Sequence, residues 1–172
     1  ITTNIVLFSD EKFNVSHLKK FISNTELTYI QDLLKTSDLK KDLFVYEVNS
    51  KKKIILISIK NNSKSVDMEN LGATLYSRIN YGKSSEYFLN SDSIVGKNEN
   101  FLGHFLHGLK LKSYAFNKYK TKKEKRVISI NVIGNKNLPS TKIQTKFKAL
   151  EEGIFCARDL VSEPGNVLHP DE

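Results

Sequence analysis

Apolar residues recur along the chain in two patterns, and these patterns alternate. Short runs of apolar and β-branched residues predict strands at residues 4–8, 44–48, 54–59, 87–89 and 126–133. Apolar positions three or four residues apart predict helices at residues 25–35, 65–80, 98–111 and 140–163. Residues 15–22 fit a helix and an extended connection equally well. We expect Thr25 and Ser65 to cap the first two of these helices.

The strand at residues 54–59 is almost wholly apolar, which is typical of a strand buried on both faces. The lysines at residues 51–53 indicate a hairpin-like turn before it. Because strands and helices alternate, the sequence predicts an α/β fold with a mixed, mostly parallel sheet sandwiched between helices. We place this domain at residues 1–138 and assign residues 139–172 to a long linker helix and the start of a junction.

The last predicted helix is the longest. Ser140 or Thr141 is placed to cap it, and Pro164 and Gly165 end it. About twenty residues make a helix of roughly 30 Å, long enough to cross a domain or to join two. One face of this helix is predicted to be apolar, with Ile143, Phe147, Leu150, Ile154, Ala157 and Val161.

Composition narrows the class of protein. Of the 172 residues 39% are hydrophobic, including ten Phe and seven Tyr, which is enough for a core. The sequence contains no apolar stretch of about 18 residues, so it predicts no membrane span. The first residues lack the features of a secretory signal. They also lack a Met, so we expect a trimmed or tagged start. The single cysteine, Cys156, is interpreted as a packing residue and suits a reducing cytoplasm.

The net charge of +8 lies almost entirely in one basic tract. Residues 110–126 contain eight basic residues and one acidic residue, so they carry +7. Aromatic residues interleave with the basic ones, a composition that can grip a nucleic-acid backbone; the alternative is a solvated loop before a strand. The residues that would make a nucleic-acid or other surface contact are Lys118, Lys120, Lys122, Lys123, Lys125 and Arg126.

Other candidate chemistry is weak. His104 and His107 lie three apart on a predicted helix, but no further metal ligand stands at a suitable spacing, so we interpret both as ordinary surface or half-buried histidines. His17 and His169 have no evident partner. The eight glycines are isolated, which disfavours a phosphate-binding loop. No catalytic set of nucleophile, histidine and acid can be assigned from spacing.

Two phrases near the end of the chain resemble a known family. Residues 157–170, ARDLVSEPGNVLHP, resemble the linker between the small N-terminal domain and the catalytic domain of leucyl (cytosol) aminopeptidases. Residues 105–122, FLHGLKLKSYAFNKYKTK, are similar to a segment of the same N-terminal domain. The two phrases come in the family's order and at its separation. Residues 1–95 match only in pattern and length.

The resemblance implies a function for the parent protein rather than for these residues. The family removes N-terminal amino acids from peptides with two divalent metals, zinc or manganese, held in a cytoplasmic, hexameric enzyme. Its ligands and catalytic residues lie beyond the linker phrase, so we expect no catalytic or metal residue here and no activity of this fragment. The N-terminal domain, which is similar to the macro fold, would support assembly and limit access to the active sites.

The resemblance leaves two further expectations. Some bacterial members of the family bind DNA, which keeps a basic nucleic-acid-binding module as the alternative function. If the apolar face of the long helix lacks its partner domain, the fragment is expected to self-associate through that helix.

Overall fold

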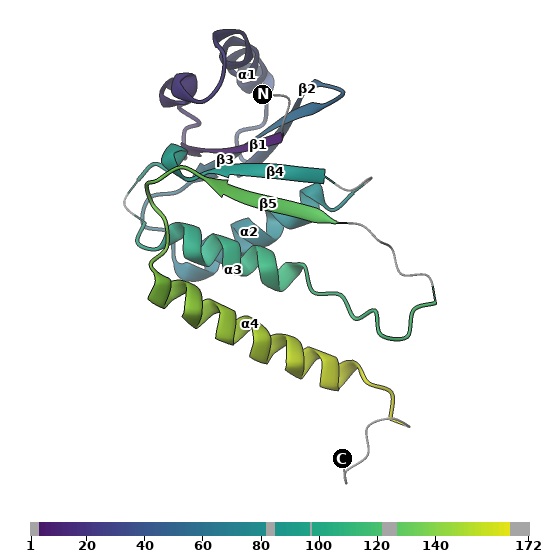
Figure 1. Ribbon diagram of the computed structural model, residues 1–172. Helices are drawn as coiled ribbons and strands as arrows, with labels where there is room; N and C mark the ends of the chain where they lie inside the picture. Colours follow the sequence, from purple (N-terminus) through teal and green to yellow (C-terminus); the bar gives the residue numbers. More distant parts are fainter. Residues whose placement is uncertain (1–3, 82–84, 97, 122–126, 166–172) are drawn as a thin grey trace.

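A five-stranded sheet forms the centre of the molecule, in a computed structural model that describes residues 4–81, 85–96, 98–121 and 127–165 (Figure 1). The strand order is β2-β3-β1-β4-β5. Only the β2–β3 pair is antiparallel, which confirms the predicted mixed, mostly parallel sheet. The strands are β1 (Asn4–Asp10), β2 (Leu43–Asn49), β3 (Lys52–Ile59), β4 (Ser85–Asn90) and β5 (Ile128–Ile133).

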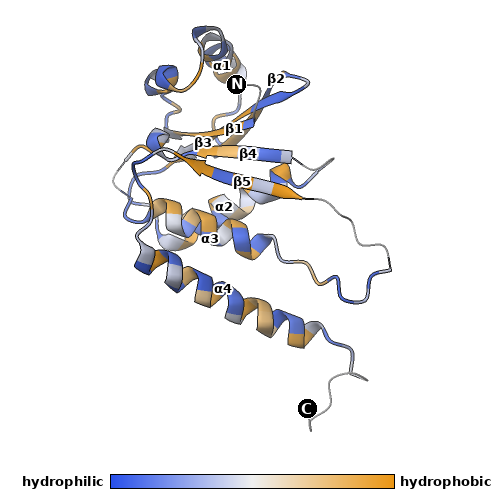
Figure 2. Cartoon of the chain, in the orientation of Figure 1, coloured by the Kyte–Doolittle hydropathy of each residue, from blue (hydrophilic) through white to orange (hydrophobic). Residues whose placement is uncertain are grey.

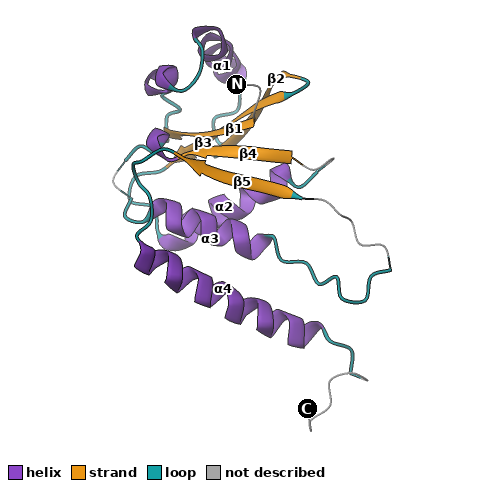
Figure 3. Cartoon of the chain, viewed as in Figure 1, coloured by secondary structure: helices purple, strands orange, loops and turns teal. Residues whose placement is uncertain are grey.

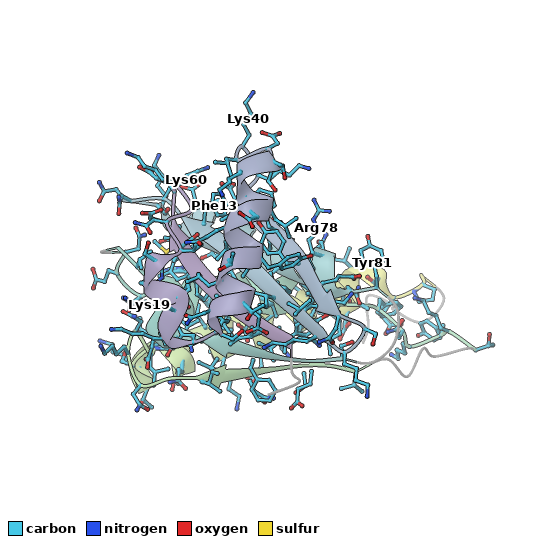
Figure 4. All side chains as sticks on the ribbon, turned by 90° about the horizontal axis from the view of Figure 1, so that it is seen from above. Phe13, Lys19, Lys40, Lys60, Arg78 and Tyr81 are labelled. Carbon is cyan, nitrogen blue, oxygen red and sulfur yellow. The ribbon has the colours of Figure 1, made fainter. Side chains whose placement is uncertain are left out.

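Helices cover both faces of this sheet (Figure 3). The α-helices are α1 (Asn24–Thr36), α2 (Ser65–Ile79), α3 (Phe101–Lys112) and α4 (Thr141–Ser162), and the 3-10 helices are η1 (Ser16–Lys20) and η2 (Ser91–Ser93). α1 lies across one face, as Figure 4 shows from above, and α2 and α3 lie against the other (Figure 1). α4 packs beyond α3, outside the three layers. The predicted sandwich with a long helix after it is confirmed.

Each face of the sheet has its own core. Phe8 lies at the centre of the core under α2 and α3, with its ring centroid 5.4 Å from those of Phe101 and Phe105. Leu7, the preceding residue, belongs to the core under α1 with Ile30. Residues 54–59 contribute to both cores in alternation, so this strand is buried on both faces as predicted.

Helix starts are where the local predictions err. Ser23, not Thr25, caps α1: its hydroxyl accepts from the Glu26 N–H, and the Glu26 carboxylate accepts from the Ser23 N–H. α2 begins at Ser65, the first residue of the predicted range, but Lys64 rather than Ser65 is its N-cap and donates its N–H to Asp67. α3 begins at Phe101 rather than at residue 98. Where a capping side chain accepts an early backbone N–H, that bond decides the first turn, and apolar spacing does not locate it.

Two further expectations are corrected or refined. Cys156 is exposed, so its interpretation as a packing residue was wrong. Residues 15–22 resolve into the short 3-10 helix η1, with only one buried residue within it, Leu18. Arg126, the predicted start of the last strand, lies outside the described residues. In the described part of the chain, no helix combines the length and apolar character that crossing a membrane requires.

Candidate functional site at the helix seam

The loop that leads into α4 is anchored before the helix begins. Gly134 has φ of +105°, a conformation that favours glycine. The carboxylate of Asp92, in η2, then accepts the backbone N–H groups of Asn135 (2.8 Å) and Lys136 (2.7 Å). These two hydrogen bonds hold the pKa of Asp92 below its usual value. Ser140 then caps α4 by accepting the Ile143 N–H, which confirms one of the two predicted caps.

Phe147 is the main apolar anchor of α4. Its side chain is the only buried one on this helix, and it lies between two histidines of α3. The His107 ring stacks on it with centroids 4.5 Å apart, and the His104 ring meets it edge-on at 5.0 Å. Gly103 makes room for this contact, since a Cβ there would lie 3.2 Å from the Phe147 ring. α3 therefore accepts α4 through a notch formed by one glycine and two imidazoles.

Both histidines are also held by carboxylates that no pattern in the sequence indicated. The His104 Nδ1 lies 2.9 Å from a carboxylate oxygen of Glu69 on α2, and the His107 Nδ1 lies 2.9 Å from one of Glu151 on α4. His104 is half-buried as expected, whereas His107 is buried. Glu69 and Glu151 lie 35 and 44 residues from their histidines, so no local spacing could have indicated these pairs.

The other histidines of the chain are His17 and His169. His17, for which the sequence suggested no partner, has its Nε2 within 3.0 Å of the Phe8 carbonyl oxygen and 3.2 Å of that of Ser93. His169 lies outside the described residues. Within the described ranges, no three His, Cys, Asp or Glu side chains are grouped so that they could hold a metal ion.

Polar and aromatic contacts attach the C-terminal half of α4. Arg158 donates to the Leu111 carbonyl oxygen at 2.8 Å, and its guanidinium lies 5.4 Å from the centroid of the Tyr114 ring. The Tyr114 hydroxyl donates to Asp159 at 2.7 Å, and the Tyr114 ring lies beside Phe155 at 5.2 Å. Apart from Phe155, these residues belong to the two family-like phrases, so the phrases contact each other in space through residues 45 and 47 positions apart in the sequence.

Glu163, directly after α4, closes this seam. Its carboxylate accepts hydrogen bonds from Lys118 and from the Tyr119 hydroxyl. The hydrogen bond from Lys118, followed by that from Tyr119, lowers the pKa of Glu163, and the same contact raises the pKa of Lys118. Lys118 is therefore an ion-pair partner of the linker helix. We define the seam as the contacts of α4 and Glu163 with α3 and residues 113–119.

The structure describes only two of the six residues that are predicted to contact a nucleic acid. Lys118 is paired with Glu163, and Lys120 is exposed. Lys122, Lys123, Lys125 and Arg126 lie outside the described residues. Nothing in the described geometry tests contact with a nucleic acid, which stays a prediction.

The predicted apolar face of α4 is divided in the structure. Ile143, Phe147 and Ile154 face the domain, but Leu150 and Val161 are 44% and 87% exposed. The docked side instead includes Glu151, Phe155 and Arg158, whose polar groups have partners across the seam. Figure 2 shows hydrophobic and hydrophilic segments alternating along the whole of α4. A single apolar stripe was therefore only partly correct, because polar groups also dock against the domain and part of the apolar surface stays exposed.

Several known proteins are similar to this chain in sequence. No family model matches the chain. A probable cytosol aminopeptidase of Clostridium perfringens (strain 13 / Type A) is 38% identical over 97 residues, covering 52% of this chain and 20% of that protein. One of Ehrlichia ruminantium (strain Gardel) is 37% identical over 108 residues, covering 59% of this chain and 20% of that protein. The chain is related to the cytosol aminopeptidases.

Solved structures agree with this relationship at the level of the fold. A mutant of tomato leucine aminopeptidase has a TM-score of 0.71 and 16% identity, with 98% of this chain and 37% of that chain covered. The bottromycin maturation enzyme BotP has a TM-score of 0.66 and 11% identity, with 98% and 34% covered. The resemblance to the N-terminal domain of leucyl aminopeptidases is thus confirmed in sequence and fold. The chain spans about a fifth of the length of the cytosol aminopeptidases that it matches.

Proposed function

We propose that this chain is a non-catalytic N-terminal domain of a leucyl aminopeptidase, and that α4 connects it to the catalytic domain in a defined orientation. The supporting observation is the contact between the two family-like phrases, in which Tyr114 meets Asp159 and the Leu111 carbonyl meets Arg158. A linker that merely tethered two domains would not need a capped start, a buried anchor and an ion-paired end. These contacts fix the direction in which α4 leaves the domain.

The chemistry of the parent enzyme then lies outside this domain. Two divalent metals, zinc or manganese, would supply the activated water that attacks the first peptide bond of a substrate. The described residues offer no ligand set for them, so no step of the reaction is assigned to this domain. A solved structure of BotP in complex with Mn, a neighbour in fold, is in keeping with a metal-dependent parent. We assign such a parent to the cytoplasm, as the name of its relatives suggests.

The open apolar surface of α4 suits the assembly role. Leu150, Leu160 and Val161 are 44%, 49% and 87% exposed and lie on the part of α4 that the domain does not cover. Apolar side chains on one helix are suited to packing against a catalytic domain or another subunit of a homo-hexamer. In that arrangement the domain would help to assemble the enzyme and limit the entry of peptides to the active sites.

A chimeric enzyme tests this proposal. In the relative from Clostridium perfringens, the N-terminal domain and its linker are replaced by residues 1–172 of this chain. We expect the chimera to assemble and to hydrolyse leucine p-nitroanilide with Mn²⁺, unlike the same relative without that region. Size-exclusion chromatography with light scattering and a rate assay give both readouts. A chimera no better than the deletion would contradict the proposal, as would metal-dependent hydrolysis by residues 1–172 alone.

The chimera also tests the seam. Arg158→Ala breaks the contact to the Leu111 carbonyl and the stacking on Tyr114, so we expect weaker assembly with an unchanged metal requirement. Lys142→Ala is the matched control, because Lys142 is exposed on the first turn of α4, outside these contacts. If both variants assemble as well as the parent chimera, the seam does not set the domain orientation.

The alternative function is a nucleic-acid-binding module built on the basic tract. The exposed position of Lys120 beside the exposed Tyr119 is the observation in its favour. Binding to duplex DNA by residues 1–172 would then weaken steeply with salt, and a variant with Lys120, Lys122 and Lys123 changed to Ala would have a smaller salt dependence. Affinity that is absent, or that does not respond to these changes, removes this alternative.

A further inference from the structure

The outer edge of β5 has features that sheet edges usually avoid. β5 pairs only with β4, so its other side is an edge of the sheet (Figure 1). Protein sheets commonly protect such an edge with charged residues, proline or a bulge. β5 has the sequence ISINVI, with no charged residue and no proline, and its register with β4 is regular. By contrast β2, the other edge strand, carries Glu47 paired with Lys53 and has an irregular register.

The hydrogen-bonding groups on this edge can be assigned. The Val127 carbonyl accepts the Ser85 N–H at 3.2 Å, so residues 127, 129, 131 and 133 direct their backbone groups toward β4. Ile128, Ile130 and Val132 therefore direct their N–H and C=O groups outward. Among the described residues none of these groups has a backbone partner. They form a row of donors and acceptors for one more strand.

An apolar groove lies directly beside this row. It has a volume of about 410 Å³ and lies between the underside of β5, α3 and α4. Ile128 and Ile130 form its roof, Leu106 and Leu109 its back wall, and Phe147 part of its floor. Side chains of a neighbouring strand point to the same face as the residues opposite them. Every second side chain of a strand added to β5 would thus point toward this groove.

The charged residues around the groove indicate which kind of strand would bind there. Lys110 and Lys148 lie at the rim, whereas the one acidic rim residue, Glu151, is occupied by His107. Lys148 is 77% exposed and has only a 4.0 Å contact to the exposed Glu152, which is a weak ion pair. A second copy of this chain would bring two more lysines and no acidic residue on its own β5. A bound strand that carries an acidic residue is therefore favoured over the β5 strand of a second copy.

We propose that β5 and this groove bind an extended peptide segment by β-strand addition, with apolar residues at alternate positions and an acidic residue at the lysine rim. The backbone of the segment pairs with Ile128, Ile130 and Val132. Its apolar side chains enter the groove between β5 and α4. This role is separate from the proposed aminopeptidase function and does not depend on it.

The first experiment tests the backbone pairing. The 172-residue chain, labelled with ¹⁵N, is titrated with the capped peptide Val-Thr-Val-Thr-Val-Thr-Glu, and amide shifts are followed by NMR. We expect the largest shifts and slowed hydrogen exchange at Ile128, Ile130 and Val132. Two further peptides carry N-methyl groups on the odd or on the even amides. Because only one set faces β5, one methylated peptide is expected to bind and the other to fail.

The second experiment tests the lysine rim. Lys148→Glu is expected to weaken binding about fivefold, as for an exposed charge pair. The same change should have no effect on a peptide with Gln in place of Glu. Lys146→Glu is the matched control, because Lys146 is also exposed on α4 but does not line the groove.

Three results would overturn the proposal. The first is no binding at millimolar peptide. The second is equal binding of both methylated peptides, which would mean docking by side chains alone. The third is protection of Ile128, Ile130 and Val132 without peptide that increases with protein concentration, which would place a second copy at this edge.

Discussion

α3 packs against a helix on each of two sides, and the two contacts differ in kind. Toward α2 the backbones touch: a Cβ on Gly72 would lie 1.9 Å from the Phe105 carbonyl oxygen, and one on Gly108 would lie 2.0 Å from that of Glu69. Toward α4 the contact consists of side chains, with Phe147 in its notch and polar pairs along the rest. The first contact leaves no side chain to adjust, whereas the second can open one side chain at a time.

The α2–α3 contact is therefore part of the folded domain, whereas the α3–α4 contact belongs to the junction. α2 and α3 form one unit with the sheet, because their closest approach is backbone on backbone and their apolar faces share a core with Phe8. α4 is attached to that unit by one buried ring, Phe147, and otherwise by groups that also interact well with water. A helix held in this way keeps a preferred direction and can still be moved by a partner domain. The following predictions test this contrast, from the largest expected effect to the smallest.

Gly108→Ala should have the largest effect. The new Cβ would meet the Glu69 carbonyl oxygen and Cα at 2.0 and 2.5 Å, so α2 and α3 must separate. We expect the free energy of unfolding to fall by about 3 kcal/mol or more, measured by urea denaturation. Gly153→Ala in α4 is the control: nothing lies within 4 Å of its Cβ, so higher helix propensity should stabilise the protein by up to about 1 kcal/mol. Similar losses for both variants would contradict the contrast.

Phe147→Ala should release α4 without unfolding the domain. The buried ring is the main apolar contact across the seam, and its removal should weaken α4 docking by about 3 kcal/mol. Hydrogen exchange should accelerate at the amides of α4 and stay slow at those of α3. Leu160→Ala, at a position that is 49% exposed, should leave both sets unchanged. Equal acceleration in α3 and α4 would show that α4 belongs to the cooperative core.

Tyr114→Phe should have a smaller effect, because it removes only the hydroxyl that donates to Asp159. We expect a loss of about 1 kcal/mol in α4 docking, read from the same exchange experiment. Combining it with Asp159→Ala gives a double-mutant cycle that isolates this contact. If the two losses simply add, the hydrogen bond does not contribute to the seam.

Acidification should loosen the end of α4. The pKa of Glu163 is lowered in the folded chain, mainly by the hydrogen bond from Lys118. Its contribution is therefore complete above the usual pKa of 4.5 and is lost as pH falls through the lower folded value. The ring signals of Tyr119, followed by NMR from pH 7 to pH 3, should change over that window. Glu163→Gln should abolish this transition, and an unaltered transition in that variant would assign it to another group.

Much of the fold could be predicted from the sequence, and particular residues show why. The uninterrupted apolar run at 54–59 could be satisfied only by a strand with a core on each side, and β3 has both cores. The hydroxyl of Ser140 and the break at Pro164 and Gly165 set the ends of α4 locally. The wording of the two family-like phrases was enough to indicate the aminopeptidase relationship, although it did not indicate that the phrases touch.

The site depended on groups that only the folded chain brings together. Glu69 and Glu151 lie in different helices from the histidines that they contact, and the Lys118 partner Glu163 is 45 residues away. The predicted apolar stripe of α4 also gave only part of the docking side, because the contact with α3 uses polar groups as well as apolar ones.

The sequence by itself determined the strands, the helices, their ends to within a few residues and the α/β class, because local hydrogen bonding and burial of one face act over short distances. Only the tertiary structure decided the strand order, the open edge at β5 and the side of α4 that docks. Those features depend on which distant surfaces meet, and a pattern of polar and apolar residues states that a face must be covered without stating by what.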